Sequence, residues 1–175
     1  MVIFRKQRIV FVHAPKTGGS AVCRALAYLE GNGEEFDRLY AQRKQGDFHI
    51  NGLHTPCPKP MPGYTVCCFT REPGSLVQSC YNYAKHRGFY KGTAEQFLKD
   101  FRNDKIVVPL SFYRKYGKYG YEKYCDFVGE FEHIEEDFYR LTGAKLEKYN
   151  VIPYPDTFTE LQMDEARDIW NQKDW

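Results

Sequence analysis

Runs of β-branched and aromatic residues predict three buried strands. The first covers residues 8–13, the second residues 64–70 and the third residues 126–131. The first two are apolar almost without interruption, which is typical of strands covered on both faces of a parallel sheet. The pattern therefore predicts a sheet in the interior of the molecule.

Amphipathic segments lie between these strands and after them. Apolar positions recur at intervals of three and four residues, and helix-start and helix-stop residues bound the segments. Pro73 suits a first helical turn, and Gly143 ends a segment. Thr93 and Thr159 each open a Thr-x-x-Gln capping box. The predicted helices are residues 20–30, 36–43, 73–86, 93–102, 133–142 and 159–175.

Strands that alternate with helices predict an α/β fold with a central, mostly parallel sheet flanked by helices. No internal repeat, low-complexity tract or linker interrupts the chain, so residues 1–175 are expected to form a single domain. Ligands of such sheets bind beyond the carboxyl ends of the strands. The loops after the first two strands are therefore the first places to look for a site.

Composition and charge narrow the function classes. The 175 residues are 42% hydrophobic, enough for a core, and no apolar run reaches the about 18 residues of a membrane span. The six cysteines include no Cys-x-x-Cys pair, so reduced, mostly buried thiols and a cytoplasmic setting are expected. Residues 1–125 carry 20 basic against 10 acidic side chains, whereas residues 126–175 carry 5 against 13. This division predicts an anionic partner for the first part: a nucleotide, a nucleic acid or an acidic polymer.

The loop after the first predicted strand has the composition of an anion site. It reads Pro-Lys-Thr-Gly-Gly-Ser over residues 15–20 and leads directly into a helix. Glycines allow close approach of the backbone, and N–H groups at a helix N-terminus point at the anion. The residue order fits neither the Walker A motif, in which Lys follows the glycines, nor the Gly-x-Gly-x-x-Gly dinucleotide motif. On the loop alone, an ordinary turn with a chance lysine is the alternative.

A second anion-type feature follows the strand at residues 64–70. Arg71 leaves this strand at the edge where Lys16 leaves the first, and Ser79 lies eight residues further on, on the polar side of the helix. A guanidinium and a hydroxyl that converge on one oxyanion suit phosphate binding. The alternative is a surface pair of Arg71 with Glu72 and a solvated Ser79. Together the two features predict a cleft with two anion sites, suited to a ligand phosphorylated at both ends.

These motifs resemble those of sulfotransferases that use 3′-phosphoadenosine 5′-phosphosulfate (PAPS), with the carbohydrate-type and bacterial branch the most similar. Residues 11–20 (FVHAPKTGGS) are similar to the family's 5′-phosphosulfate loop, and residues 69–73 with Ser79 resemble its 3′-phosphate motif. Residues 127–137 (FVGEFEHIEED) are similar to a third family stretch, a strand and an acidic helix near the cofactor. The resemblance implies the P-loop-like sulfotransferase fold.

The resemblance also implies a reaction and the residues that serve it. A sulfuryl group would move from PAPS to an acceptor hydroxyl or amine, and 3′-phosphoadenosine 5′-phosphate (PAP) would leave. Arg71 and Ser79 would hold the 3′-phosphate, and Lys16 would also neutralise charge on the leaving phosphate. A metal is not required, and no Walker B carboxylate is evident. The residues expected to hold the 5′-phosphosulfate are Lys16, Thr17, Gly18, Gly19, Ser20 and Ala21.

A catalytic base is expected in the loop region before the second strand. Related sulfotransferases carry a catalytic His or Glu there, and His49 and His54 both lie in this region. Residues 52–56 (GLHTP) look more like the family's Gly-His segment, which favours His54 as the base. His13 is expected to pack beneath the anion loop.

The sequence leaves the acceptor open. A carbohydrate or another small hydroxyl compound is expected, and a lipid headgroup or a tyrosyl peptide stays possible because the chain is short for the family. The Tyr- and Lys-rich residues 112–124 either stack on a sugar or base, or are core tyrosines between solvated lysines. Competing classes are a catalytically inactive nucleotide-binding protein on the same scaffold, a nucleic-acid-binding module and a kinase. The last two lack a recognisable nucleic-acid motif and a Walker A motif, respectively.

Overall fold

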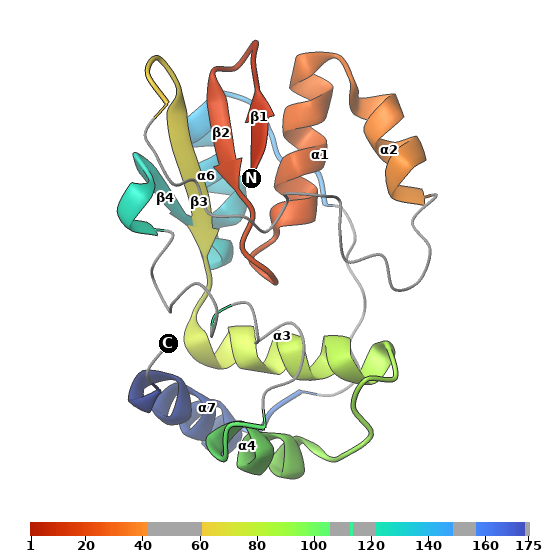
Figure 1. The fold of residues 1–175 in the computed structure, drawn as a ribbon, viewed down its shortest axis with the longest axis vertical. Coiled ribbons are helices and arrows are strands. Elements are labelled where there is room, and N and C mark those ends of the chain that lie inside the picture. Colours follow the sequence, from red (N-terminus) through yellow and green to blue (C-terminus); the bar gives the residue numbers. More distant parts are fainter. Residues whose placement is uncertain (42–60, 106–112, 114–121, 149–156, 174–175) are drawn as a thin grey trace. The chain divides into compact units, whose positions relative to one another are not determined.

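The fold is described from a computed structural model of the chain (Figure 1). The structure describes residues 1–41, 61–105, 113, 122–148 and 157–173. Contacts within the chain divide it into two compact units. Unit 1 comprises residues 1–70 and 121–151, and unit 2 comprises residues 71–120 and 152–175.

A four-stranded mixed sheet is the centre of unit 1, as expected for an α/β fold. Its strand order is β1 (Val2–Phe4), β2 (Ile9–Val12), β3 (Thr65–Thr70) and β4 (Phe127–Glu130). β1 pairs antiparallel with β2, whereas the β2–β3 and β3–β4 pairs are parallel (Figure 1). The three predicted strands and their parallel pairing are confirmed. β1 was not predicted, because three residues are too few to show a hydrophobic period.

The parallel register brings three carboxyl ends to one edge of the sheet. Phe11 lies opposite Cys67, and Cys67 lies opposite Phe127. β2, β3 and β4 therefore run side by side in one direction, and the segments that follow them begin at the same edge of unit 1. This edge is where ligands of parallel sheets bind.

Two helices cover one face of this sheet with apolar side chains. They are α1 (Gly19–Glu30) and α6 (Ile134–Thr142). The Phe69 ring meets Phe11 edge-on at 6.3 Å and Phe127 at 6.4 Å between ring centroids, and a side chain at Gly129 would collide with it. The core side chains on this face are Phe4, Ile9, Phe11, Cys67 and Phe69 from the strands and Val22, Cys23, Leu26, Ala27 and Phe138 from the helices.

The alternate residues of β2 and β3, which point to the opposite face, are buried as well. They are Val10, Val12, Val66 and Cys68. Burial of both faces of β2 and β3 confirms the reading of their continuous apolar runs. Helix α2 (Gly33–Ala41) follows α1 and begins earlier than the predicted residue 36.

Three helices make up the described part of unit 2. They are α3 (Pro73–His86), α4 (Ala94–Arg102) and α7 (Glu160–Gln172), and α7 packs against both of the others (Figure 1). Their predicted bounds are confirmed to within a few residues. At the centre, the Tyr81 ring lies 5.3 Å from the Phe97 ring between centroids.

Only part of the Tyr- and Lys-rich stretch at residues 112–124 lies within the described residues. Tyr113 is buried, with its ring edge-on to Trp170 at 5.0 Å between centroids. Tyr113 is thus a core tyrosine, whereas Tyr124 is 50% exposed.

The expectation of buried thiols is confirmed for most of the cysteines. Cys23, Cys67, Cys68 and Cys80 are buried thiols outside any disulfide, and Cys125 is half-buried. Burial raises the pKa of the Cys67 thiol well above its ordinary value. Among the helices within the described ranges, none has the length and apolar character that crossing a membrane requires.

Only one of the two predicted capping boxes closes fully. Thr159 Oγ1 accepts from the Gln162 N–H at 3.3 Å, and Gln162 Oε1 accepts from the Thr159 N–H at 3.0 Å. Thr93 caps α4 in the same way at 3.2 Å, but the Gln96 side chain donates to Asp100 instead.

We predict that Thr159→Ala lowers the free energy of unfolding by about 1 kcal/mol, measured by urea denaturation. Gln162→Ala should lower it too, because the Thr159 N–H loses its acceptor. Gln96→Ala is the matched control and should cost less, since the Thr93 cap does not depend on it. Equal losses for Gln96→Ala and Gln162→Ala would contradict the assignment.

Candidate functional site

The candidate site is the loop that joins β2 to α1 at the carboxyl edge of the sheet. Six residues, 13–18, make the connection. Gly18 is the N-cap of α1, and its carbonyl accepts from the N–H groups of Ala21 at 2.9 Å and Val22 at 3.2 Å. The predicted strand, glycine-containing turn and helix are therefore present in this order.

Two residues of the loop have left-handed backbone. Gly18 has a φ of 76°, and Lys16 has a φ of 66°. This conformation costs a residue with a β-carbon about 1 kcal/mol or more, and residues held in it are concentrated at binding sites. Lys16 therefore depends on its neighbours to keep its backbone in place.

Thr17 braces the loop from the inside. Its side chain is 1% exposed, and its Oγ1 donates to the Ala14 carbonyl at 3.0 Å. Ala14 is fully buried as well. The Thr17 hydroxyl is thus used within the loop, where it holds the turn in place.

Side chains on two sides enclose the glycines of the loop. A β-carbon at Gly19 would overlap the His13 imidazole, which confirms that His13 packs beneath the loop. A β-carbon at Gly18 would overlap Ile134 and lie 3.1 Å from Phe131. Phe131 and Ile134 belong to the stretch at residues 127–137, so this stretch does lie next to the loop.

The N-terminus of α1 has the electrostatics of an anion site. None of the described side chains caps it, and its first turn contains no acidic residue. The first N–H groups of a helix have no partner within the helix and carry partial positive charge. α3 differs, because the Glu72 carboxylate accepts from the N–H groups of Gly74 at 2.9 Å and Ser75 at 2.7 Å. An external anion therefore has a better partner in α1 than in α3.

Tyr40 is a neighbour of the loop that the sequence did not indicate. Its hydroxyl donates to Ser20 Oγ at 3.4 Å, and its ring stacks on Phe36 at 5.8 Å between centroids. Ser20 and Ala21 are both half-buried. The contact joins α2 to the first turn of α1, across 20 residues of sequence.

Arg71 and Ser79, the residues expected to bind a 3′-phosphate, belong to unit 2. Arg71 follows Thr70 of β3 directly, and its Nε donates to Ser75 Oγ at 2.8 Å. Ser79 is 4% exposed, so the reading of Ser79 as a solvated residue is wrong. Glu72 pairs with Arg167 at 2.7 Å. His49 and His54, the candidate bases, lie outside the described residues.

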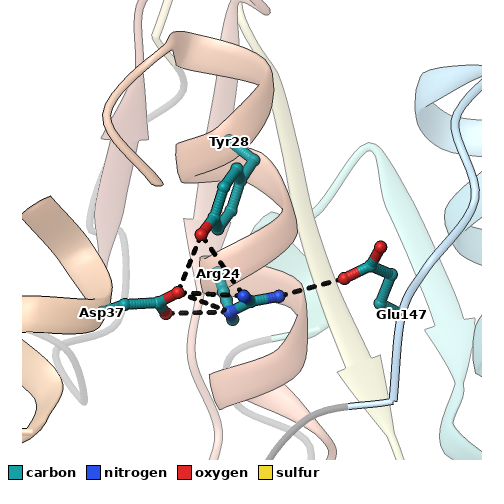
Figure 2. Close-up of polar contacts among 4 residues, drawn as sticks. All are labelled: Arg24, Tyr28, Asp37 and Glu147. Atoms are coloured by element: carbon teal, nitrogen blue, oxygen red, sulfur yellow. Dashed lines mark hydrogen bonds and ion pairs between the residues drawn. The ribbon is translucent and has the colours of Figure 1, made fainter. Parts of the chain in front are cut away.

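Arg24 is the centre of a second polar cluster, which ties α1 to α2 and to residues 144–148 (Figure 2). Its Nε and Nη2 donate to the Asp37 carboxylate at 2.8 and 2.9 Å, and Nη1 donates to Glu147 at 3.2 Å. The Tyr28 hydroxyl also donates to Asp37, at 2.8 Å. The bonds from Arg24 hold the pKa of Asp37 below its ordinary value.

A cavity of about 340 Å³ lies beside this cluster, within unit 1. Its lining includes Ala21, Ala25, Leu29, Phe138, Ala144 and Lys145. The lining also includes the charged or polar side chains of Arg24, Tyr28 and Glu147. The Arg24 cluster is a structural tie that holds α1, α2 and residues 144–148 together.

Comparison of the chain with family models, with curated proteins and with solved structures finds no match.

We predict that Glu72→Gln makes the free energy of unfolding depend less on pH in the acid range. Burial raises the pKa of Glu72, but the N–H groups of Ser75 and Gly74 and the Arg167 guanidinium outweigh it and leave this pKa lowered. Ionised Glu72 therefore contributes fully to the free energy of unfolding at pH values above its pKa in the unfolded chain, about 4.3. This contribution is lost as the pH falls through the lower pKa of Glu72 in the folded protein.

Urea denaturation at pH 7 should show Glu72→Gln less stable than the unsubstituted protein by about 1 kcal/mol. At pH 3 the difference in the free energy of unfolding between Glu72→Gln and the unsubstituted protein should be smaller. Glu95→Gln, an exposed residue in the first turn of α4, is the control and should change little at either pH. A difference between Glu72→Gln and the unsubstituted protein that is the same at pH 7 and pH 3 would refute the assignment.

Proposed function

We propose that this chain is a PAPS-dependent sulfotransferase of the carbohydrate type, with a P-loop-like sulfotransferase fold. The observation that carries the proposal is the loop at residues 15–20. It combines a sequence similar to the family's phosphosulfate loop with a left-handed Lys16 and a helix N-terminus without a side-chain cap. These features supply positive charge and backbone donors at one place.

We assign the 5′-phosphosulfate to this loop. Gly19 and Ser20 begin α1 and would supply their N–H groups, and Ala21 follows them with its N–H bonded to the Gly18 carbonyl. Thr17 is 1% exposed, and its bond to Ala14 would hold the loop in shape around the anion. Gly18 and Gly19 are required by their neighbours, because a β-carbon at Gly18 would meet Ile134 and one at Gly19 would meet the His13 ring. The tetrahedral anionic group is proposed to bind Lys16 and the N–H groups at the start of α1.

We assign the 3′-phosphate to Arg71 and Ser79. The bond from Arg71 Nε to Ser75 Oγ fixes the guanidinium beside the first turn of α3. Ser79 is buried, so a phosphate oxygen would have to reach a side chain that is 4% exposed. Arg71 is therefore the residue of this pair that the binding test below substitutes.

The reaction is an in-line displacement at sulfur. The acceptor oxygen forms a bond to sulfur while the bond from sulfur to the 5′-phosphate oxygen breaks, and PAP leaves. The Lys16 ammonium neutralises charge that develops on the leaving oxygen. The acceptor proton passes to a base, for which we propose His54, with His49 as the alternative. The scheme needs no metal.

We further propose a carbohydrate or another small hydroxyl compound as acceptor, and a cytoplasmic setting. The setting is supported by the burial of four thiols outside any disulfide. A nucleic-acid partner is not part of the proposal.

Thermal unfolding with nucleotides tests the binding step. PAP is expected to raise the melting temperature far more than adenosine 5′-phosphate, which lacks the 3′-phosphate. Lys16→Ala and Arg71→Ala should each weaken PAP binding by about tenfold or more, because each removes a charge-assisted contact. Lys145→Ala, an exposed lysine after α6, is the control. Equal stabilisation by the two nucleotides would remove the basis for assigning Arg71 and Ser79.

Incubation with labelled PAPS and a panel of acceptors separates the enzyme from an inactive nucleotide-binding protein. We expect label on a hydroxyl acceptor, with strongly reduced transfer for His54→Ala and for Lys16→Ala. PAP binding without transfer to any acceptor would favour the inactive binding protein. Transfer at full rate by Lys16→Ala would refute the role given to Lys16.

A further inference from the structure

His13 supports the anion loop directly through its ring. The side chain is 8% exposed, and the imidazole occupies the space where a β-carbon of Gly19 would lie. The backbone at Gly19 therefore rests on the imidazole without an intervening side chain. A glycine is required here by the close approach of the His13 ring.

The imidazole is in turn held by the core of unit 1. Its ring meets Phe11 edge-on, at 5.9 Å between centroids and an interplanar angle of 80°. Phe11 is fully buried and meets Phe69 of the neighbouring strand at 6.3 Å. A row of rings thus runs from the centre of the sheet to the underside of the loop.

Gly18 is supported from another side. A β-carbon there would overlap Ile134 of α6 and lie close to Phe131. Since the two glycines are confined from two directions, the position of the backbone at the start of α1 depends on the size of the side chains around it. Of these, His13 packs against Gly19, the first residue of α1.

We propose that His13 is a positioning residue. Its imidazole packs against Gly19 and so fixes the position of the Gly18–Gly19 backbone, and this position determines how strongly the site prefers a nucleotide with a 5′-phosphate. This inference rests on the proposed function, because it concerns the same loop. Removal of the His13 ring leaves a cavity next to Gly18 and Gly19, two residues whose backbone is easily moved. The N–H groups at the start of α1 are then no longer held pointing toward the 5′-phosphate. The assignment of the 3′-phosphate to Arg71 and Ser79 does not depend on His13.

The affinities for PAP and for adenosine 3′-phosphate, which lacks the 5′-phosphate, test this by isothermal titration. Their ratio reports the 5′ site alone. His13→Ala should reduce the ratio by about tenfold and change the affinity for adenosine 3′-phosphate little, as expected for loss of oriented charge-assisted contacts. His13→Phe keeps a flat ring and should restore most of the ratio.

Two controls separate positioning from a loss of stability. Leu26→Val, in the buried core of α1, should lower the melting temperature and leave the ratio unchanged. As a single substitution, Gly19→Ala should reduce the affinity ratio, because the alanine β-carbon meets the His13 imidazole. In the double variant with His13→Ala, the alanine has room, and the affinity ratio should be higher than in His13→Ala alone. Should His13→Ala not fold, His13→Asn makes the same comparison.

The outcomes distinguish this inference from the proposed function. An affinity ratio that is unchanged in His13→Ala would overturn the positioning role. So would a Gly19→Ala substitution that lowers the affinity ratio equally in the presence and in the absence of His13. In both cases the proposed function stands. Failure of the unsubstituted protein to prefer PAP over adenosine 3′-phosphate would overturn the proposed function, and the role of His13 with it.

Discussion

β2 and β3 pair in parallel with Phe11 opposite Cys67, and this pairing is the constraint on which the site depends. Both strands are buried on both faces, so neither can shift by one residue without exchanging the side chains of its two faces. The register therefore fixes where each strand ends. Because the strands are parallel, the loop after β2 begins at the edge where the chain passes from Thr70 into Arg71.

The loop is stabilised by contacts among its own residues and with α6 of unit 1. Lys16 keeps a left-handed backbone that a residue with a β-carbon does not favour. The buried bond from Thr17 to Ala14, and the packing of His13 and Ile134 against the glycines, provide the compensating support. The donor groups of the first turn of α1 are thus held in place before any ligand binds, which is the condition for selective anion binding.

The sequence predicted most of the fold because the signals were local. Continuous apolar runs marked β2 and β3, and Thr159 with Gln162 marked the start of α7 through a capping box that closes as expected. The loop at residues 15–20 was identified for the same reason, since a strand, glycines and a helix follow one another within a few residues. His13 could be placed beneath the loop because it comes directly after β2.

What the sequence missed depends on contacts between distant residues. Nothing in the sequence indicated that Glu72 caps α3 and pairs with Arg167, 95 residues away. Ser79 lies on the polar side of α3, yet it is buried, because a helical pattern predicts which residues share a side but not what covers that side. The contact of Tyr40 with Ser20 has no signal in the sequence, since nothing in α2 marks its hydroxyl.

The most direct test of the account is a titration of the isotopically labelled protein with PAP, followed by the amide resonances of the chain. If the start of α1 binds the 5′-phosphate, the N–H resonances of Gly18, Gly19 and Ser20 should shift most strongly and saturate together with binding. Binding of PAP that leaves these three resonances unmoved would contradict the central claim.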